Sequence, residues 1–404
     1  MGGAENRDHP ADTRFGLLLA LVFVLLAGLL ITSRDAYLIH IDAAWITTPY
    51  NRFAYFCDDI PACLRIGSSW SWKLITELMN SGIHVLGINT TDGATGLTAS
   101  DIRDNAERVA AVLHRLLVLA PVPVAAVLIT RTKPAAILIL SLAFAVMLGW
   151  SPLLYRPLID FYNLFANWPR NYWDFSFALQ FYDFVSVGFL FCLLIRLSRP
   201  QPPGYADAIL LVLIGQLLFE NLGIVAGIAV ALRYGLLSAG PARWKPALCR
   251  LAASAAASVM LLGVMLALIQ ANKGADPTGH AVTLSAYFDS YRELVAENIR
   301  SLPIIIANFI NLMTLPLVIG GLAGLLLSRI DRTPADDPRQ PDRLAVTALS
   351  ISAGFAVTIC IGFFVNSYQS ETGRQILPFL TMLTITSCLT LRWLLARRSR
   401  RQSA

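Results

Sequence analysis

The chain has few charged residues and none of several short motifs that mark common enzyme classes. Charged side chains make up 14% of its 404 residues, whereas hydrophobic ones make up 56%. It contains no Walker A loop, GxGxxG turn, CxxC pair, HExxH or GxSxG. These absences disfavour nucleotide-driven pumping, dinucleotide redox chemistry, zinc proteolysis and serine hydrolysis by a standard route.

Cysteine is also scarce, with six residues, which are too few for a disulfide scaffold. Cys57 and Cys63 alone are placed as a pair, and a bridge between them would require an oxidising compartment. Spacing by itself leaves open whether they are bridged. The other four lie in or beside apolar runs, where we expect them to pack as small hydrophobes: Cys192, Cys249, Cys360 and Cys388.

Long apolar runs are abundant, and the mean hydropathy is +0.59. Such a chain is too apolar for a soluble domain, and most runs approach the roughly 20 residues that a helix needs to cross a bilayer. The sequence therefore predicts an all-α polytopic membrane protein with about ten transmembrane helices and a large exterior loop after the first span. The predicted spans cover residues 15–32, 109–130, 135–152, 178–197, 206–237, 248–270, 302–327, 344–366 and 375–396.

The net charge of +6 is spread over short clusters between these runs, which favours orientation in a bilayer over nucleic-acid binding. One further basic cluster lies on the same side of the membrane as the others only if residues 206–237 cross the membrane twice, with a turn near Phe219 to Gly223. The positive-inside rule therefore favours two crossings. This cluster consists of Arg233, Arg243, Lys245 and Arg250. A single tilted helix is the alternative. The loop 328–343 on the same side has the composition of a disordered linker.

This layout predicts an integral protein of the bacterial inner membrane with both termini in the cytoplasm. Its parts are a cytoplasmic tail at 1–14, the first span at 15–32, a large periplasmic loop with interfacial helices at 33–107, a helical bundle at 108–396 and a basic cytoplasmic tail at 397–404. No small-residue cleavage signature follows the first run, so we expect a retained span and not a signal peptide.

The exterior loop carries the first set of candidate catalytic residues. They are the four aspartates Asp35, Asp42, Asp58 and Asp59. A carboxylate beside apolar surface has a raised proton affinity, which suits a general base that accepts a proton from a hydroxyl. The alternative is that these acids only keep the loop solvated.

Ionisable residues near the outer ends of spans form a second candidate set, for substrate binding. They are His114, Arg115, Asp183, Glu220, Glu371 and Arg374. Charged groups at membrane depth are costly and usually face a cavity, a partner or a substrate path. Arginine suits a phosphate because its planar fork donates two hydrogen bonds at once. The alternative is a structural ion pair, for example Glu371 with Arg374.

Aromatic residues are dense between 155 and 184. An interfacial aromatic belt explains them, and a groove for a sugar or prenyl chain would use the same residues. The histidines His40, His84 and His280 show no metal-ligand spacing. The sequence therefore predicts no metal site and leaves the need for a divalent ion open.

The layout resembles that of the polytopic GT-C glycosyltransferases. The resemblance lies in the first span followed by a large loop with Asp35 and Asp42, in the many later spans, and in the motifs ENLG at 220–223 and ETGRQILPF at 371–379. It implies inverting transfer of a hexose or pentose from a polyprenyl-phosphate carrier to an acceptor hydroxyl, in modification of a cell-envelope glycan. The chain departs from the family because no adjacent Asp-Glu or Glu-Asp pair directly follows the first span.

By this resemblance Asp35 or Asp42 matches the base, while Arg374, with Arg115, matches the residues that hold the carrier phosphate; the departure leaves the identity of the base open among the exterior aspartates. The implied partners are the lipid-linked sugar and membrane lipids, with no certain cofactor and no indication of oligomeric state. A secondary transporter or lipid flippase is one alternative, although no internal repeat stands out. An O-antigen polymerase or ligase would share the substrate but typically carries its large loop late in the chain. A non-catalytic assembly protein is the remaining alternative.

Overall fold

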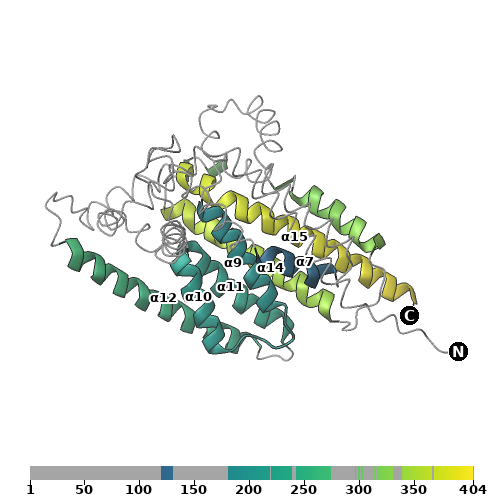
Figure 1. The fold of residues 1–404 in the computed structure, drawn as a ribbon, viewed down its shortest axis with the longest axis horizontal. Coiled ribbons are helices and arrows are strands. Elements are labelled where there is room, and N and C mark those ends of the chain that lie inside the picture. The colour runs from purple at the N-terminus through teal and green to yellow at the C-terminus, as the bar shows by residue number, and fades with distance from the viewer. Residues whose placement is uncertain are drawn as a thin grey trace, which may run out of the picture.

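The computed structural model describes residues 120–130, 181–218, 220–238, 243–273, 316–330, 339–365 and 368–403, with a few positions between 296 and 314. All elements in this part of the chain are helices (Figure 1). Three of them are long and apolar enough to cross a membrane: α12 (Trp244–Lys273), α14 (Gln340–Val365) and α15 (Tyr368–Ser403). The described residues are thus all-helical with three candidate membrane spans, as an all-α membrane protein requires, whereas a total of about ten spans and the large loop stay predictions.

The remaining helices are shorter and equally apolar. They are α7 (Pro121–Thr130), α9 (Phe181–Leu197), α10 (Tyr205–Leu218), α11 (Glu220–Leu237) and an unlabelled helix at Pro316–Ile330. The predicted spans that fall on described residues coincide with these helices. The boundaries differ most for α15, which begins at Tyr368 and continues to Ser403, beyond both limits of the predicted span 375–396.

The long run 206–237 is a helical hairpin. Helix α10 ends at Leu218 and α11 begins at Glu220, and Gly215 is so close to the backbone of Leu222 that a Cβ atom would lie 2.9 Å from its carbonyl carbon. Farther from the break on both helices, Val212 approaches Gly227. These pairings make the helices antiparallel, so a single tilted helix through this region is excluded.

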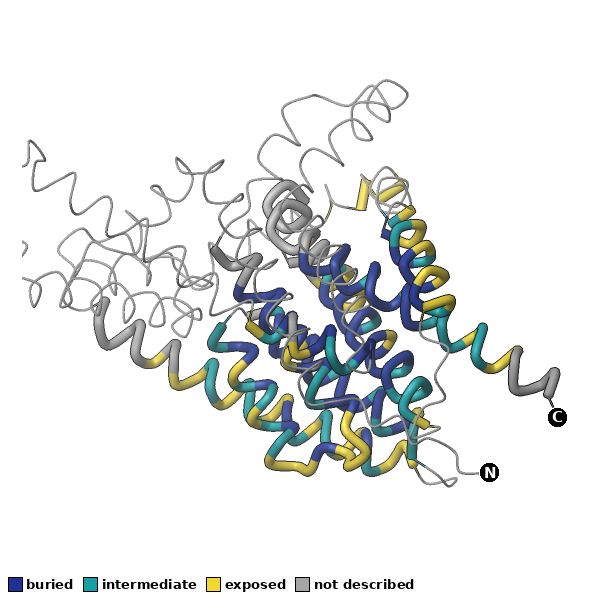
Figure 2. The backbone as a smooth tube through the Cα atoms, turned by 45° about the vertical axis from the view of Figure 1, so that its right-hand side comes forward, coloured by how far each residue is buried: buried dark blue, intermediate teal, exposed yellow. Residues whose placement is uncertain are grey.

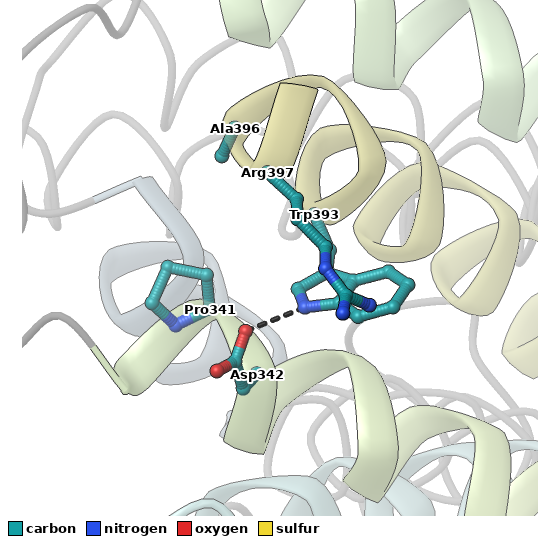
Figure 3. Close-up of a pocket in the computed structure, with 5 residues that line it drawn as sticks. All are labelled: Pro341, Asp342, Trp393, Ala396 and Arg397. Atoms are coloured by element: carbon teal, nitrogen blue, oxygen red, sulfur yellow. Dashed lines mark hydrogen bonds between the residues drawn. The ribbon is translucent and has the colours of Figure 1, made fainter. Parts of the chain in front are cut away.

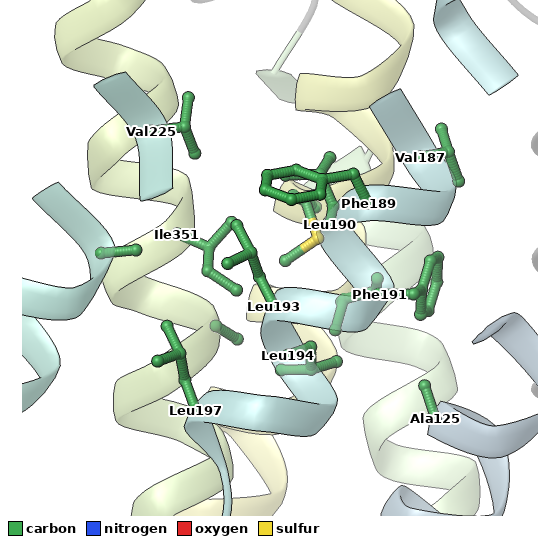
Figure 4. Packing of buried hydrophobic residues seen from close by; sticks show 14 of the residues in the cluster. Ala125, Val187, Phe189, Leu190, Phe191, Leu193, Leu194, Leu197, Val225 and Ile351 are labelled. Carbon is green, nitrogen blue, oxygen red and sulfur yellow. The ribbon is translucent and has the colours of Figure 1, made fainter. Parts of the chain in front are cut away.

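Helix α9 lies in the middle of the bundle, between α7, α11, α14 and α15 (Figure 1). Most of its described side chains are buried, and Leu190, Phe191 and Leu193 are completely enclosed (Figures 2 and 4). Phe355 of α14 and Phe379 of α15 meet beside this cluster with ring centroids 6.2 Å apart. The apolar core is therefore built around α9, although its hydropathy does not distinguish it from its neighbours.

Small residues bring the helices close together. A Cβ atom on Gly354 would lie 2.8 Å from the carbonyl oxygen of Val225, where α14 crosses α11. Gly320 and Gly324, one turn apart, face the backbone of α15 in the same way. Lipid tails are as apolar as leucine, so packing between membrane helices depends on such close contact and on polar pairs.

Hydroxyl groups provide some of these polar pairs. Ser352 of α14 and Thr386 of α15 are hydrogen-bonded at 2.7 Å in the interior. On the other side of the bundle, Ser258 of α12 donates to the side-chain carbonyl of Gln216 at 2.6 Å. Other buried hydroxyls, such as those of Thr358 and Thr384, donate to the carbonyl four residues earlier in their own helix.

Helix α12 lies at the edge of the bundle (Figures 1 and 2). Only 11% of its apolar window is buried, against 56% for α14 and 50% for α15. Val259 and Met260 are more than two-thirds exposed, and nothing lies within 4 Å of a Cβ placed on Gly263. The outward face of α12 is therefore apolar but not packed against other described helices, as expected for a helix face that contacts lipid.

The cysteine prediction needs correction. Cys388 is buried at 2% exposure, as expected, but Cys192, Cys249 and Cys360 are exposed. All four are free thiols. The prediction was wrong for three of them because an apolar run contains both core-facing and outward-facing positions, and hydropathy does not separate the two. Cys57 and Cys63 lie outside the described residues.

Candidate functional site

The two ends of the bundle differ in chemistry. Helices α7, α9 and α11 finish at one end, where α10, α12 and α14 begin. Most of the described cations lie there, and we call it the basic end; it is defined by Arg196, Arg199, Arg233, Arg243, Lys245, Arg250, Arg339, Arg343, Arg392, Arg397 and Arg398. We call the other end, where α9, α11 and α15 begin, the opposite end.

Two arginines at the basic end bind the carbonyl groups of the last residue of α9 and of the two residues that follow it. Arg233 is only 3% exposed and donates to the carbonyl oxygens of Leu197 at 2.9 Å and Arg199 at 2.8 Å. Arg343 donates to the carbonyl of Ser198 at 3.2 Å. The last four carbonyls of a helix have no partner within it, and cations there also favour the negative end of the helix dipole. These arginines therefore stabilise α9 where α11 and α14 meet it.

Two further arginines bind backbone carbonyls of other segments, one at the end of a helix and one in the turn before α10. Arg392 of α15 donates to the carbonyl of Ile129, next to the last residue of α7, at 2.7 Å. Arg250 of α12 donates to the carbonyl of Pro203 at 3.0 Å, and its guanidinium lies 4.5 Å from the ring centroid of Tyr205 and 4.0 Å from that of Tyr234. The cations thereby join segments that are far apart in the sequence.

An ion pair starts α10. Asp207, in its first turn, binds Arg196 at the end of α9 and also accepts a hydrogen bond from the backbone N–H of Gly204 at 3.2 Å. An acid in the first turn that binds back to the preceding N–H is one half of a capping box. Asp207 therefore stabilises both the turn at 198–204 and the start of α10.

A small pocket opens between α14 and α15 at the basic end (Figure 3). Its volume is about 270 Å³, and it is lined by Pro341, Asp342, Trp393, Ala396 and Arg397. The carboxylate of Asp342 accepts a hydrogen bond from the indole N–H of Trp393, and the guanidinium of Arg397 lies 5.3 Å from the centroid of that indole.

The structure corrects one prediction at this end. Residues 328–343 have the composition of a disordered linker, yet Gln340 to Arg343 form the first turn of α14. Asp342 and Arg343 both bind side-chain or backbone groups of other helices. Composition was misleading because the proline at position 341 suits the first turn of a helix, where its missing N–H has no intrahelical partner.

The predicted substrate-binding residues on described helices lie at the opposite end. Asp183 is in the first turn of α9, Glu220 is the first residue of α11, and Glu371 and Arg374 are in the first two turns of α15. Because these three helices all begin at that end, the four positions lie at the same end of the bundle. Their side chains lie outside the described part of the structure.

The other candidates fall outside the described residues. These are Asp35, Asp42, Asp58 and Asp59 of the exterior loop, together with His114 and Arg115. The aromatic stretch 155–184 lies mostly outside them as well. Among the residues that are described, no three His, Cys, Asp or Glu side chains gather where they could hold a metal ion.

The sequence predicted where the arginines of the basic end lie, but not that several of them cap helices. A signal was present: Arg196 stands at the end of an apolar run and Arg233 stands inside one. An arginine within an apolar run is costly unless buried acceptors meet it.

No family model, curated protein or solved structure matches this chain.

Proposed function

We propose that this chain is a membrane glycosyltransferase that transfers a sugar from a polyprenyl-phosphate carrier to an acceptor hydroxyl on the outer face of a bacterial inner membrane. In this proposal the basic end faces the cytoplasm, following the positive-inside rule, and the opposite end faces the periplasm. About ten spans, both termini in the cytoplasm and a periplasmic loop at 33–107 complete the layout.

One observation carries the proposal: helices α9, α11 and α15 begin at the same end of the bundle. Helix N-termini carry partial positive charge and favour phosphate. Arg374 lies in the second turn of α15, at the same end of the bundle as these N-termini. Asp183, Glu220 and Glu371 start the same three helices and supply carboxylates suited to sugar hydroxyls. A carrier phosphate with its sugar requires this combination of charges.

The reaction then follows from the chemistry of these groups. One of Asp35, Asp42, Asp58 and Asp59 accepts the proton of the acceptor hydroxyl. The acceptor oxygen attacks the anomeric carbon from the face opposite the phosphate, and the bond from that carbon to the phosphate oxygen breaks with its electron pair. Arg374, assisted by Arg115 and His114, stabilises the negative charge left on the carrier phosphate. The anomeric centre is inverted.

A lipid flippase or secondary transporter is the second candidate, favoured by the short length of α10 before the hairpin turn to α11. Helix α10 has 14 residues and is about 21 Å long, which is short of the roughly 30 Å hydrocarbon core. Helices that end within the apolar layer are common at transporter binding sites. In this case Glu220 at the start of α11 would contact the substrate.

The test is deletion of the gene, followed by complementation with Asp35→Asn, Asp42→Asn, Asp58→Asn and Asp59→Asn singly. Asp92→Asn in the same loop is the matched control. Mass spectrometry of lipid extracts and of envelope glycan should show the lipid-linked sugar accumulating and the glycan losing that sugar in at least one variant. Full activity of all four variants at normal protein levels would remove the acid-loop mechanism.

The same cells separate the two candidates. A transferase defect leaves the lipid-linked sugar on the outer leaflet, where membrane-impermeant periodate oxidises it. A flippase defect leaves it on the inner leaflet, protected from periodate. If the lipid-linked sugar of the deletion strain is protected from periodate, the transferase proposal is wrong and the flippase is favoured.

A further inference from the structure

We propose that the pocket between α14 and α15 binds the headgroup of an aminoethyl phospholipid, phosphatidylethanolamine, at the surface of the basic end. The pocket is at the far end of the bundle from the residues of the proposed transfer reaction, so the inference does not depend on that reaction.

The pocket lies at headgroup depth. The apolar window of α14 starts at Gln340 and that of α15 ends at Arg398, so its lining residues stand where both helices leave the apolar layer. Tryptophan is enriched at this boundary because its ring is apolar and its N–H is polar. A ligand that fills the pocket from this level is a lipid headgroup.

The pocket presents one negative and one positive group on different sides of a single indole ring (Figure 3). Asp342 meets the N–H edge of Trp393 through one carboxylate oxygen, while Arg397 lies over the ring face. Within the described part of the chain these two side chains form no ion pair with each other or with a third residue. The second carboxylate oxygen and the guanidinium N–H groups are therefore available to a ligand.

Asp342 contrasts with the other described acid of the basic end. Asp207 is occupied by Arg196 and by the N–H of Gly204, and so completes a cap and an ion pair. Among the described residues, Asp342 accepts one hydrogen bond, from the neutral indole of Trp393, and forms no ion pair. A half-used carboxylate beside a pocket is suited to a cationic ligand group.

The chemistry of the two groups selects the headgroup. A primary ammonium donates up to three hydrogen bonds, one of which can reach the free oxygen of Asp342, while the adjacent phosphate accepts from the fork of Arg397. A choline headgroup has no N–H to donate. A glycerol headgroup has no cation and would leave Asp342 beside its phosphate. A volume of about 270 Å³ admits a headgroup and excludes a prenyl chain.

The full-length protein, purified in detergent, would be titrated with phosphatidylethanolamine, phosphatidylglycerol and phosphatidylcholine of identical acyl chains. Bound lipid is counted by native mass spectrometry. We expect phosphatidylethanolamine to bind about tenfold more tightly than the other two, as one additional ion pair and hydrogen bond provide. Equal binding of all three lipids would overturn the proposal.

Two variants assign the preference to the pocket. Asp342→Asn keeps an acceptor for Trp393 and should fold normally, but it should remove the preference for phosphatidylethanolamine over phosphatidylcholine. Arg397→Gln should weaken binding of all three lipids, whereas Arg398→Gln, an exposed neighbour that does not line the pocket, should weaken none. An unchanged preference in Asp342→Asn would overturn the assignment.

Soluble glycerophosphoethanolamine tests the source of the headgroup. We expect it to compete with the lipid only at much higher concentration, because the acyl chains of the lipid remain in the micelle beside the helices. Equal affinity of the soluble compound would assign the pocket to a free amino-phosphate and overturn the lipid assignment.

Discussion

The basic end and the opposite end of the bundle use charge in different ways. At the basic end Arg233, Arg343 and Arg392 bind backbone carbonyls, so they hold helices in place. At the opposite end the charged residues begin helices, at positions where carboxylates favour the positive end of the helix dipole. The difference teaches that charge at the ends of these helices has two uses: on one side it binds backbone carbonyls, and on the other it stands at helix N-termini, where the residues of the proposed transfer reaction lie.

The largest effect on folding should come from Arg233. Arg233→Leu removes two hydrogen bonds from a charged group, to the carbonyls of Leu197 and Arg199, which costs about 3 kcal/mol even though Thr347 still donates to the carbonyl of Leu197. The midpoint of unfolding in sodium dodecyl sulfate should fall sharply. Arg398→Leu, exposed at the same end, is the matched control and should change the midpoint little. Equal effects of the two variants would mean that the cap does not hold α9.

The opposite end should respond in activity and not in stability. Arg374→Leu removes the cation proposed to hold the carrier phosphate, and sugar transfer should fall about 100-fold, as loss of one transition-state donor does. Arg374→Lys should recover part of this rate because it keeps the charge but not the fork. If Arg374→Leu unfolds as readily as Arg233→Leu, the two ends do not differ in their effect on stability, and this contrast between them is wrong.

Packing inside the bundle should give the next effect. In Gly354→Ala the new methyl group would lie 2.8 Å from the carbonyl oxygen of Val225, and overpacking of this kind costs about 1–3 kcal/mol. Gly263→Ala on α12 meets nothing within 4 Å and should be neutral or stabilising by up to about 1 kcal/mol. Both are measured by the same detergent unfolding. Destabilisation by Gly263→Ala would show that something covers the outward face of α12.

The smallest effect should come from the polar pair between α10 and α12. Ser258→Ala removes the 2.6 Å hydrogen bond to Gln216, and interhelical hydrogen bonds in membrane proteins contribute about 0.6 kcal/mol on average. Ser258→Thr keeps the hydroxyl and serves as control. A loss several times larger would indicate that this pair, and not the apolar contact, attaches α12 to the bundle.

Much of the fold could be predicted from particular residues. The lengths of the apolar runs predicted α12, α14 and α15, since crossing a bilayer sets a minimum length. The positions of Arg233, Arg243, Lys245 and Arg250 predicted a turn near residue 219, and α10 and α11 form that hairpin. Less could be predicted where composition was ambiguous, as at Gln340 to Arg343, which were expected in a linker and begin α14.

The candidate site could be predicted only as a set of positions. Asp183, Glu220, Glu371 and Arg374 were chosen because charge near the outer end of an apolar run is costly. Their shared end of the bundle follows from the directions of α9, α11 and α15. The pocket at Asp342 and Arg397 could not be predicted, because these residues are 55 positions apart in the sequence and only the antiparallel packing of α14 and α15 brings them together.

By itself the sequence determined that this chain enters a membrane, roughly where its helices lie and on which side its cations gather, since burial of apolar length and placement of charge act locally along the chain. Only the tertiary structure decided that α9 is central and α12 peripheral, that Arg233 and Arg343 cap one helix, and which apolar faces are packed. The physical reason is that lipid and a protein core are equally apolar. Hydropathy therefore cannot tell a helix face that meets lipid from one that meets another helix.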